Sequence, residues 1–143
     1  MMIVNPDGEL VKSYQKTFLY ESDEIWASEG SGFSCFNLKP DLKVGLAICM
    51  DLNPYKFQAP FEKFELGNYL KSENARGLIC SMAWRMIDDK TDETDHPAMD
   101  DEAKDPLAHI DYWILRLKPL QVQDVFCVFL TVLCIDGKDL SLL

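Results

Sequence analysis

Apolar residues in this chain alternate with polar ones over several short runs, which is the pattern of half-buried β-strands. The segment Asn5-Pro-Asp-Gly8 is typical of a tight hairpin turn. A second antiparallel hairpin is predicted across Lys39-Pro40-Asp41, which separates two apolar runs. The pattern as a whole predicts strands over residues 10–20, 33–38, 43–49, 77–81 and 121–135.

Two further segments have the apolar spacing of helices. Residues 60–72 form the first, opened by Pro60, with three side chains predicted to face inward: Phe61, Phe64 and Leu70. The second begins with Asp105 as N-cap and Pro106 in the first turn, and it ends at Pro119. Its predicted inward side chains are Leu107, Ile110, Trp113, Ile114 and Leu117.

Strands and helices therefore alternate, and we expect an α/β fold. With 143 residues, 48% of them apolar, we expect one domain (1–143) that buries a core. No run approaches the roughly 18 apolar residues of a membrane helix, so no membrane partner is expected. The N-terminus lacks the basic and apolar regions of a signal peptide, which predicts a protein that is not secreted.

Charge and cysteine content narrow the possible partners. The net charge of −10 argues against binding to nucleic acid or to an anionic membrane surface. Five cysteines without a C-x-x-C pair predict reduced thiols in the cytoplasm or the nucleus. His96 and His109 lie far apart and neither has a ligand at metal-site spacing, so no metal or cofactor is expected.

Residues 88–105 stand out because nine of these 18 residues are acidic and two are lysines. A calcium loop or a docking site for a basic partner is one interpretation. The segment lacks the Gly and Glu that an EF-hand loop needs at its sixth and twelfth positions. A solvated insertion loop is the alternative that fits charge blocks in general.

The segment 44–57 is the most informative for chemistry. Its apolar run ends abruptly in Cys49, and Asp51 and a turn that contains Pro54 follow. This arrangement is expected to present the thiol at the edge of a buried sheet, where it could serve as a nucleophile. A buried core cysteine is the alternative. Lys16 lies among aromatic residues on another predicted strand; an ammonium beside a thiol lowers its pKa and stabilises an oxyanion. Glu24, eight residues on, is a candidate to orient that ammonium, or an ordinary loop carboxylate.

Two motifs, in this order, resemble the nitrilase (carbon–nitrogen hydrolase) superfamily: Tyr14-Gln-Lys16-Thr-Phe-Leu-Tyr-Glu-Ser-Asp-Glu24, and Val44-Gly-Leu-Ala-Ile-Cys49-Met-Asp51 with Pro54. Further segments are similar to the fungal-type branch that deamidates N-terminal Asn and Gln of proteins: Cys49-Met-Asp-Leu-Asn-Pro-Tyr-Lys-Phe57, Ala59-Pro-Phe61, Met82-Ala-Trp84 and Tyr112-Trp-Ile-Leu-Arg-Leu117. The resemblance covers roughly residues 5–120.

The resemblance implies an αββα sandwich and a Glu–Lys–Cys triad. By motif position Cys49 is the nucleophile, Lys16 the triad lysine, and the Met50 backbone N–H lies beside the oxyanion. Glu24 matches an additional Glu that some family amidases carry near the lysine. As a hypothesis of our own, Asp51 binds a substrate α-ammonium and Trp84 forms an apolar wall, with a turn-capping Asp and a core Trp as the alternatives.

Two departures from the family pattern affect the expected function. The triad Glu comes from a strand well upstream of the lysine, and only 15 residues precede Lys16; Glu9 does not occupy the motif position. The family's Asn-Arg and Gly-Ser-Ser segments do not occur in residues 121–143, a divergent tail. We therefore expect an incomplete domain. Three functions stay open: an N-terminal amidase acting on protein or peptide N-termini, another amidase or nitrilase, and an inactive fragment that serves as a binding module.

Overall fold

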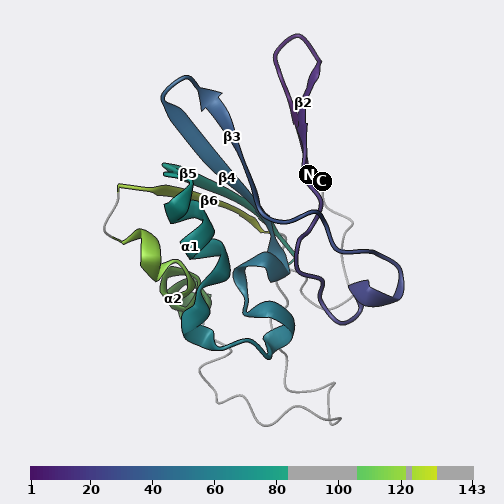
Figure 1. Cartoon of the computed structure of the whole chain (residues 1–143), viewed down its shortest axis with the longest axis vertical. Helices are drawn as coiled ribbons and strands as arrows, with labels where there is room; N and C mark the ends of the chain where they lie inside the picture. The colour runs from purple at the N-terminus through teal and green to yellow at the C-terminus, as the bar shows by residue number, and fades with distance from the viewer. Residues whose placement is uncertain (84–105, 122–123, 132–143) are drawn as a thin grey trace.

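A computed structural model describes residues 1–83, 106–121 and 124–131. Strands β1 (Met2–Val4) and β2 (Leu10–Ser13) form a small antiparallel sheet. A larger sheet has the strand order β3-β4-β5-β6, made of β3 (Ser34–Lys39), β4 (Leu42–Ile48), β5 (Gly77–Met82) and β6 (Phe126–Thr131). The β1–β2 hairpin stands apart from this sheet in Figure 1.

Both predicted hairpins are confirmed. In the first turn the side-chain oxygen of Asn5 accepts hydrogen bonds from the backbone N–H groups of Asp7 and Glu9, at 3.1 and 2.8 Å. Gly8 has a φ of 85°, a left-handed conformation that glycine adopts at little cost. Strands β3 and β4 pair antiparallel, as the apolar runs on either side of Pro40 predict.

The remaining strands pair in parallel, β4 with β5 and β5 with β6. Helix α1 (Glu65–Ser72) lies between β4 and β5 in the chain, and helix α2 (Pro106–Arg116) between β5 and β6. This alternation confirms the predicted α/β class. Because β4 and β5 run the same way, Cys49 and Ala83, which follow them, lie at the same edge of the sheet.

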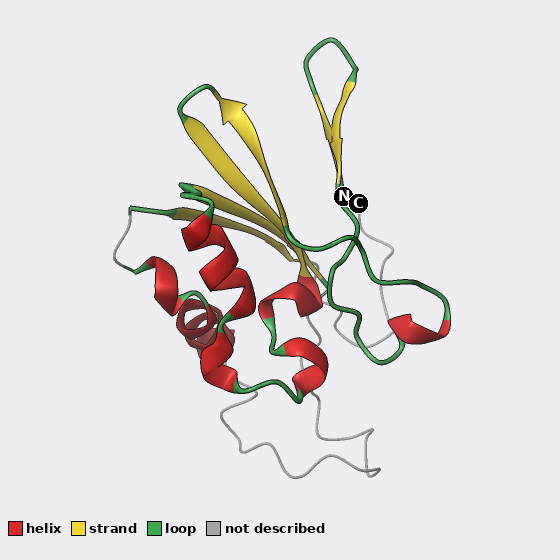
Figure 2. Ribbon diagram, in the orientation of Figure 1, coloured by secondary structure: helices red, strands yellow, loops and turns green. Residues whose placement is uncertain are grey.

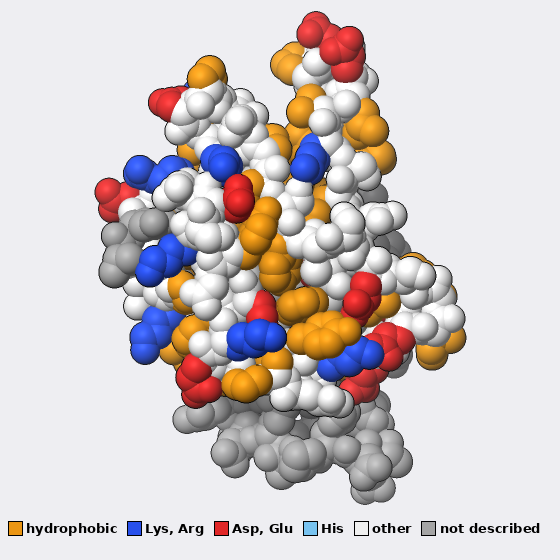
Figure 3. All heavy atoms as spheres, viewed as in Figure 1, with side chains coloured by type: hydrophobic (Ala, Val, Ile, Leu, Met, Phe, Trp, Pro, Cys, Tyr) orange, Lys and Arg blue, Asp and Glu red, His pale blue; other side chains and the backbone are white. Residues whose placement is uncertain are grey.

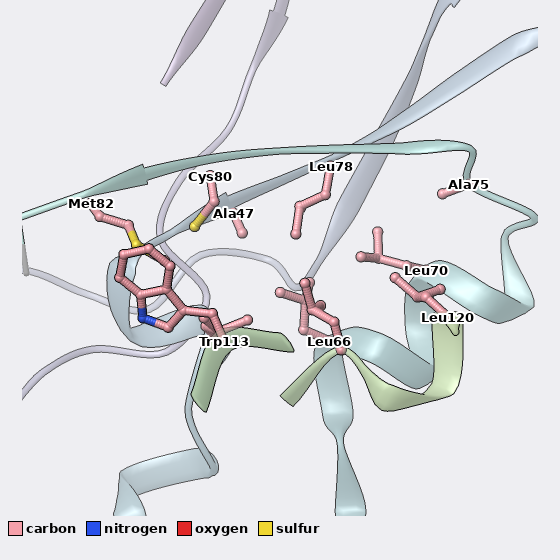
Figure 4. Packing of buried hydrophobic residues seen from close by; sticks show 11 residues of the cluster. Ala47, Leu66, Leu70, Ala75, Leu78, Cys80, Met82, Trp113 and Leu120 are labelled. Atoms are coloured by element: carbon pink, nitrogen blue, oxygen red, sulfur yellow. The ribbon is translucent and has the colours of Figure 1, made fainter. Parts of the chain in front are cut away.

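Both helices cover one face of the larger sheet (Figure 2). Between the layers is a cluster of buried side chains, shown in Figure 4: Ala47, Leu52, Leu66, Leu70, Ala75, Leu78, Cys80, Met82, Trp113, Leu117 and Leu120. Gly45 lets α1 approach the sheet closely, since a Cβ added there would lie 2.1 Å from the Leu70 Cδ2 atom.

Several boundaries differ from the predictions. The first helix starts at Glu65, because Phe64 takes a left-handed φ of 42° after a separate 3₁₀ turn, η4 (Phe61–Lys63). The strand predicted over residues 10–20 ends at Ser13. Helix α2 begins at Pro106 as predicted, and Pro119 lies in the short turn η6 (Lys118–Leu120) that follows it.

The predicted inward stripe of α2 is correct for Trp113 and Leu117, which are buried, and wrong for three exposed members: Leu107, Ile110 and Ile114. The buried position on that side is Arg116 instead, at 2% exposure. Over the described ranges no helix is long and apolar enough to cross a membrane. Those same ranges hold no cluster of three or more His, Cys, Asp or Glu side chains suited to a metal ion. The acidic segment 88–105 lies outside the described residues.

Candidate active site

Cys49 lies directly after β4, at the first position of a 3₁₀ turn, η2 (Cys49–Leu52). Its φ of 44° is left-handed, a conformation that costs a residue with a Cβ about 1–2 kcal/mol. The turn carries the thiol away from the strand direction, and the Sγ donates a weak hydrogen bond to the Ala83 carbonyl at 3.7 Å. The predicted placement of Cys49 at a strand-to-turn junction is confirmed.

The groups around the Cys49 thiol shift its pKa in opposite directions. Burial is the largest influence and raises the pKa of Cys49. The positive charge of Lys16 lowers that pKa, while the carboxylates of Asp23 and Asp51 raise it. The net shift of the pKa is upward. The sign of the Lys16 effect is the one expected of an ammonium beside a thiol, and the other groups outweigh it. The role of Lys16 in stabilising the thiolate stays a prediction.

Lys16 is held in a loop that follows β2. Its carbonyl accepts a hydrogen bond from the Gly30 N–H at 2.8 Å, which closes the loop at its base. A side chain at Gly30 is excluded, since an added Cβ would lie 2.6 Å from the Gln15 carbonyl oxygen. The Lys16 Nζ donates to the Asp23 Oδ2 at 2.6 Å, and both side chains are largely buried.

Asp23 is thus the carboxylate that pairs with Lys16, a role for which the sequence favoured Glu24. Partial burial alone would raise the pKa of Asp23; the hydrogen bonds from Lys16 and from the Tyr20 N–H outweigh it and lower that pKa. Glu24 points elsewhere and forms an exposed ion pair with Lys56, 3.0 Å between Oε1 and Nζ. The predicted contact between Glu24 and Lys16 is wrong, because the 3₁₀ turn η1 (Asp23–Ile25) presents its first residue to the lysine.

The two interpretations of Asp51 differ sharply in what they require. A substrate ligand needs an accessible oxygen, yet the residue is 0% exposed. Both carboxylate oxygens accept hydrogen bonds, including one at 2.7 Å from the backbone N–H of Ile48, the residue before Cys49. The geometry favours the turn-capping interpretation over binding of a substrate ammonium.

Met50 is buried and directly follows Cys49, and its carbonyl accepts a hydrogen bond from the Asn53 N–H at 2.9 Å. A hollow of about 180 Å³ opens next to it, with acidic and basic groups on its wall: Glu21, Glu24 and Lys56. A larger hollow of about 320 Å³ lies between β2 and Ser34, away from Cys49. The oxyanion role of the Met50 N–H stays a prediction. Trp84 lies outside the described residues.

The turn after Cys49 is anchored to the helices by a buried arginine. The Arg116 guanidinium donates to the Leu52 carbonyl at 2.8 Å and to the Phe61 carbonyl, and it pairs with Glu65 at 3.0 Å. Two aromatic rings flank it, Phe61 at 4.9 Å and Phe64 at 5.4 Å from the guanidinium carbon to the ring centre. Arg116 therefore ties η2, η4 and α1 to α2.

Sequence reasoning missed Asp23 and Arg116 for different reasons. Asp23 lies seven positions after Lys16 and directly before the predicted Glu24. The sequence pattern alone does not show which of these two neighbouring carboxylates pairs with the lysine. Arg116 stands beside Leu117 in an apolar helix, where a long cation is ordinarily read as exposed. A charged residue next to a buried helical stripe was the available signal.

A scan of the sequence against protein-family models finds no match. Two curated proteins, both described as protein N-terminal amidase, are similar to the chain. One, from Schizosaccharomyces pombe, is 41% identical over 130 residues, which cover 82% of this chain and 43% of the relative. The other, from Saccharomyces cerevisiae, is 38% identical over 101 residues, 58% of this chain and 22% of the relative. The chain thus spans less than half the length of either protein.

Solved structures of N-terminal amidases are also similar to this chain. A cysteine-to-serine variant of an N-terminal amidase matches with a TM-score of 0.66 and 26% identity, over 81% of this chain and 43% of that one. Its complexes with an Asn-Glu-Ala peptide and a Gln-Val peptide match with TM-scores of 0.65 and 0.64, at the same identity and coverage. The predicted resemblance and the nitrilase-type fold are confirmed.

Proposed function

Because this chain is a homologue of the protein N-terminal amidases, which are carbon–nitrogen hydrolases of the nitrilase superfamily, we propose that it hydrolyses the side-chain carboxamide of N-terminal Asn or Gln residues and releases ammonia. The observation that carries the proposal is the thiol of Cys49 on a strained turn at the end of β4, where the positive charge of Lys16 lowers its pKa. The chain spans 43% of the more similar relative, so the activity is a proposal for these 143 residues.

In the proposed reaction the Cys49 thiolate attacks the carboxamide carbon and forms a C–S bond. The C–N bond breaks, and the nitrogen leaves as ammonia after it gains a proton. Water then attacks the acyl-thioester, which restores the thiol and leaves a carboxylate on the substrate. An N-terminal Asn becomes Asp, and an N-terminal Gln becomes Glu.

Five further groups have proposed roles in this scheme. The Lys16 ammonium and the Met50 N–H stabilise the oxyanion that forms on the carboxamide oxygen. Asp23 holds the ammonium through the 2.6 Å ion pair. Glu24, on the wall of the hollow beside Met50, is proposed as an additional carboxylate. Trp84 is proposed to form an apolar wall for the substrate.

Ammonia release from an Asn-initiated peptide tests the proposal directly. We expect release with the chain as it stands and none with Cys49→Ala, at equal protein concentration. A Cys127→Ala variant is the matched control, because Cys127 lies on β6 and should leave the rate unchanged. Release that does not depend on Cys49, or no release at all, would favour an inactive fragment.

Specificity separates the N-terminal amidase from another amidase or nitrilase. Acetylation of the peptide's α-amine should abolish turnover, because the free N-terminus is the recognised feature. Equal turnover of the free and acetylated peptides would point to a different carbon–nitrogen hydrolase. The peptides in the solved structures of the neighbours begin with Asn or Gln, which supports the choice of substrate.

We further propose that the protein acts in the cytoplasm, or in the nucleus, on protein and peptide N-termini. Four cysteines of the described residues are free thiols, as a reducing compartment requires: Cys35, Cys49, Cys80 and Cys127. Imaging of a fluorescent fusion, with fractionation of the cells, would test this location, and recovery from the secreted fraction would contradict it.

A further inference from the structure

Asp51 is a fully buried carboxylate that accepts four hydrogen bonds. Its Oδ1 accepts from the backbone N–H groups of Thr17 and Phe18, at 2.9 and 2.8 Å. Its Oδ2 accepts from the Tyr14 hydroxyl and from the Ile48 N–H, both at 2.7 Å. A buried carboxylate is costly unless it is hydrogen-bonded, and here the donors come from two separate parts of the chain.

These donors flank the two groups of the proposed chemistry. Tyr14, Thr17 and Phe18 lie on either side of Lys16, and Ile48 immediately precedes Cys49. A single carboxylate therefore connects the loop that carries the ammonium to the turn that carries the thiol. The Tyr14 hydroxyl also lies within hydrogen-bond distance of the Thr17 hydroxyl, at 2.8 Å, which joins the residues on either side of Lys16.

The Lys16 loop depends on such a connection because residues 14–20 belong to no strand. Pairing with a neighbouring strand would fix the backbone of a strand residue. Here the Asp51 Oδ1 atom accepts hydrogen bonds from two consecutive backbone N–H groups instead. The position of the Lys16 backbone relative to Cys49 is thereby set through Asp51.

We propose that Asp51 is a positioning residue that holds Lys16 at the distance from Cys49 at which the ammonium stabilises the thiolate. The inference deepens the proposed function, on which it rests, because it assigns a role within the same site. It also replaces direct contact between Asp51 and a substrate ammonium.

The inference has a competitor that predicts the opposite sign. The negative charge of Asp51 acts directly on Cys49 and raises the pKa of its thiol. If charge were its whole effect, Asp51→Asn would increase the thiolate fraction and speed alkylation of Cys49. If Asp51 positions Lys16, the same change slows alkylation, because an asparagine NH₂ cannot accept the Ile48 N–H and the connection loosens.

The experiment is a double-mutant cycle on the rate of Cys49 alkylation by iodoacetamide, measured peptide by peptide with mass spectrometry over a range of pH. We expect Lys16→Gln and Asp51→Asn each to slow Cys49 at neutral pH by about tenfold, and each to move its pH profile upward by about one unit. The double variant should be no slower than Lys16→Gln alone. A faster Asp51→Asn, or effects that multiply in the double variant, would overturn the inference.

Two further variants distinguish a specific effect of Asp51 on Lys16 from a general loss of structural stability. Asp41→Asn removes an exposed carboxylate in the β3–β4 turn and should leave Cys49 unchanged. Tyr14→Phe removes one donor and keeps the three backbone bonds, so we expect a smaller slowing of the same sign. If Asp51→Asn does not fold by circular dichroism, Tyr14→Phe carries the cycle: its effect on Cys49 must disappear in the Lys16→Gln background, and persistence there would contradict the role.

Alkylation needs no turnover, so this test and the test of the proposed function fail separately. A chain that releases no ammonia yet shows the coupling keeps the positioning role and loses the activity. A chain that releases ammonia without the coupling keeps the activity and loses the positioning role.

Discussion

Burial and nearby charges set the direction in which the pKa of the Cys49 thiol is shifted. The pKa of Cys49 is raised by burial and by two carboxylates, and it is lowered by Lys16 and by the hydrogen bond with Ala83. A raised thiol pKa means that the thiolate fraction at neutral pH is small and increases as the pH rises through that pKa. Substitutions at neighbouring charges should therefore move the reactivity of Cys49 in directions that the structure specifies.

Asp23→Asn should speed alkylation of Cys49. The change removes a carboxylate that raises the thiol pKa, while the hydrogen bonds to Asp51 still hold the backbone on the C-terminal side of Lys16. We expect the rate at neutral pH to rise by about three- to tenfold, and the pH profile to move downward.

Glu24→Gln is the matched control for Asp23→Asn. Glu24 is the next residue, it is exposed, and it pairs with Lys56 instead of Lys16. Site-resolved mass spectrometry should show no change at Cys49. A response to Glu24→Gln without one to Asp23→Asn would restore the assignment made from the sequence motif.

The backbone at Cys49 provides a stability test that is independent of activity. Because its φ is 44°, glycine is the residue that adopts this turn without strain. Both Cys49→Gly and Cys49→Ala remove the thiol, and we expect the glycine variant to be more stable by about 1 kcal/mol. Urea denaturation followed by circular dichroism gives the comparison. Equal stability, or a more stable alanine variant, would argue against the left-handed turn.

At the level of elements, long-range contacts decide where helices and strands stop. The apolar pattern over residues 10–20 favours one strand, yet Tyr14, Thr17 and Phe18 donate to Asp51, 33–37 residues away, and the strand ends at Ser13. Local propensity is a weak constraint compared with the cost of an unpaired buried carboxylate.

Arg116 should be the costliest single position among these element contacts. It is 2% exposed and satisfies Glu65 and two backbone carbonyls. Replacing it with leucine leaves a largely buried Glu65 carboxylate unpaired, which costs about 3–5 kcal/mol of unfolding free energy. Chemical denaturation measures the loss, and Arg116→Lys should recover little of it, because an ammonium lacks the planar set of donors.

The exposed ion pair of Lys43 with Glu73 is the control for Arg116. Both side chains are more than a third exposed, and the Nζ to Oε2 distance is 3.1 Å. Solvent screening limits such pairs to about 0–1 kcal/mol, so Lys43→Gln should cost less than 1 kcal/mol. Comparable losses at Lys43 and Arg116 would contradict the buried role of the arginine.

For the whole molecule, the two faces of the larger sheet differ in how well they are covered. The helices cover one face, where Phe129 of β6 packs against Trp113 with ring centres 5.0 Å apart. The alternate β6 residues on the other face are exposed and apolar: Phe126, Val128 and Leu130. Figure 3 shows further apolar side chains gathered between the two hairpins, on the side of the molecule turned to the viewer.

An exposed apolar strand at the edge of a sheet can pair with another chain, so we expect β6 to promote self-association. Val128→Lys should reduce concentration-dependent association in sedimentation velocity, with little change in the unfolding midpoint, because the side chain points away from the helices. Leu38→Lys, an exposed change in β3, is the control. Association that persists in Val128→Lys, or that Leu38→Lys reduces equally, would contradict a role for this face.

The sequence by itself determined the α/β class, both hairpins, the start of α2 and the location of Cys49 at the end of a strand. These follow from local causes: the period of apolar residues, turn-forming Asn, Gly and Pro residues, and a cysteine where an apolar run stops. The two family motifs also predicted Lys16 as the triad lysine, a role that stays a prediction.

Only the tertiary structure decided which partner each carboxylate of the two motifs binds. Asp23, Glu24 and Asp51 all lie in the two motifs, yet one pairs with Lys16, one with Lys56, and one is buried beneath both motifs. The choice depends on the turn at Asp23 and on contacts across more than 30 residues, which a sequence pattern does not encode. The burial of Arg116 was decided in the same way, by three segments that meet only in the folded chain.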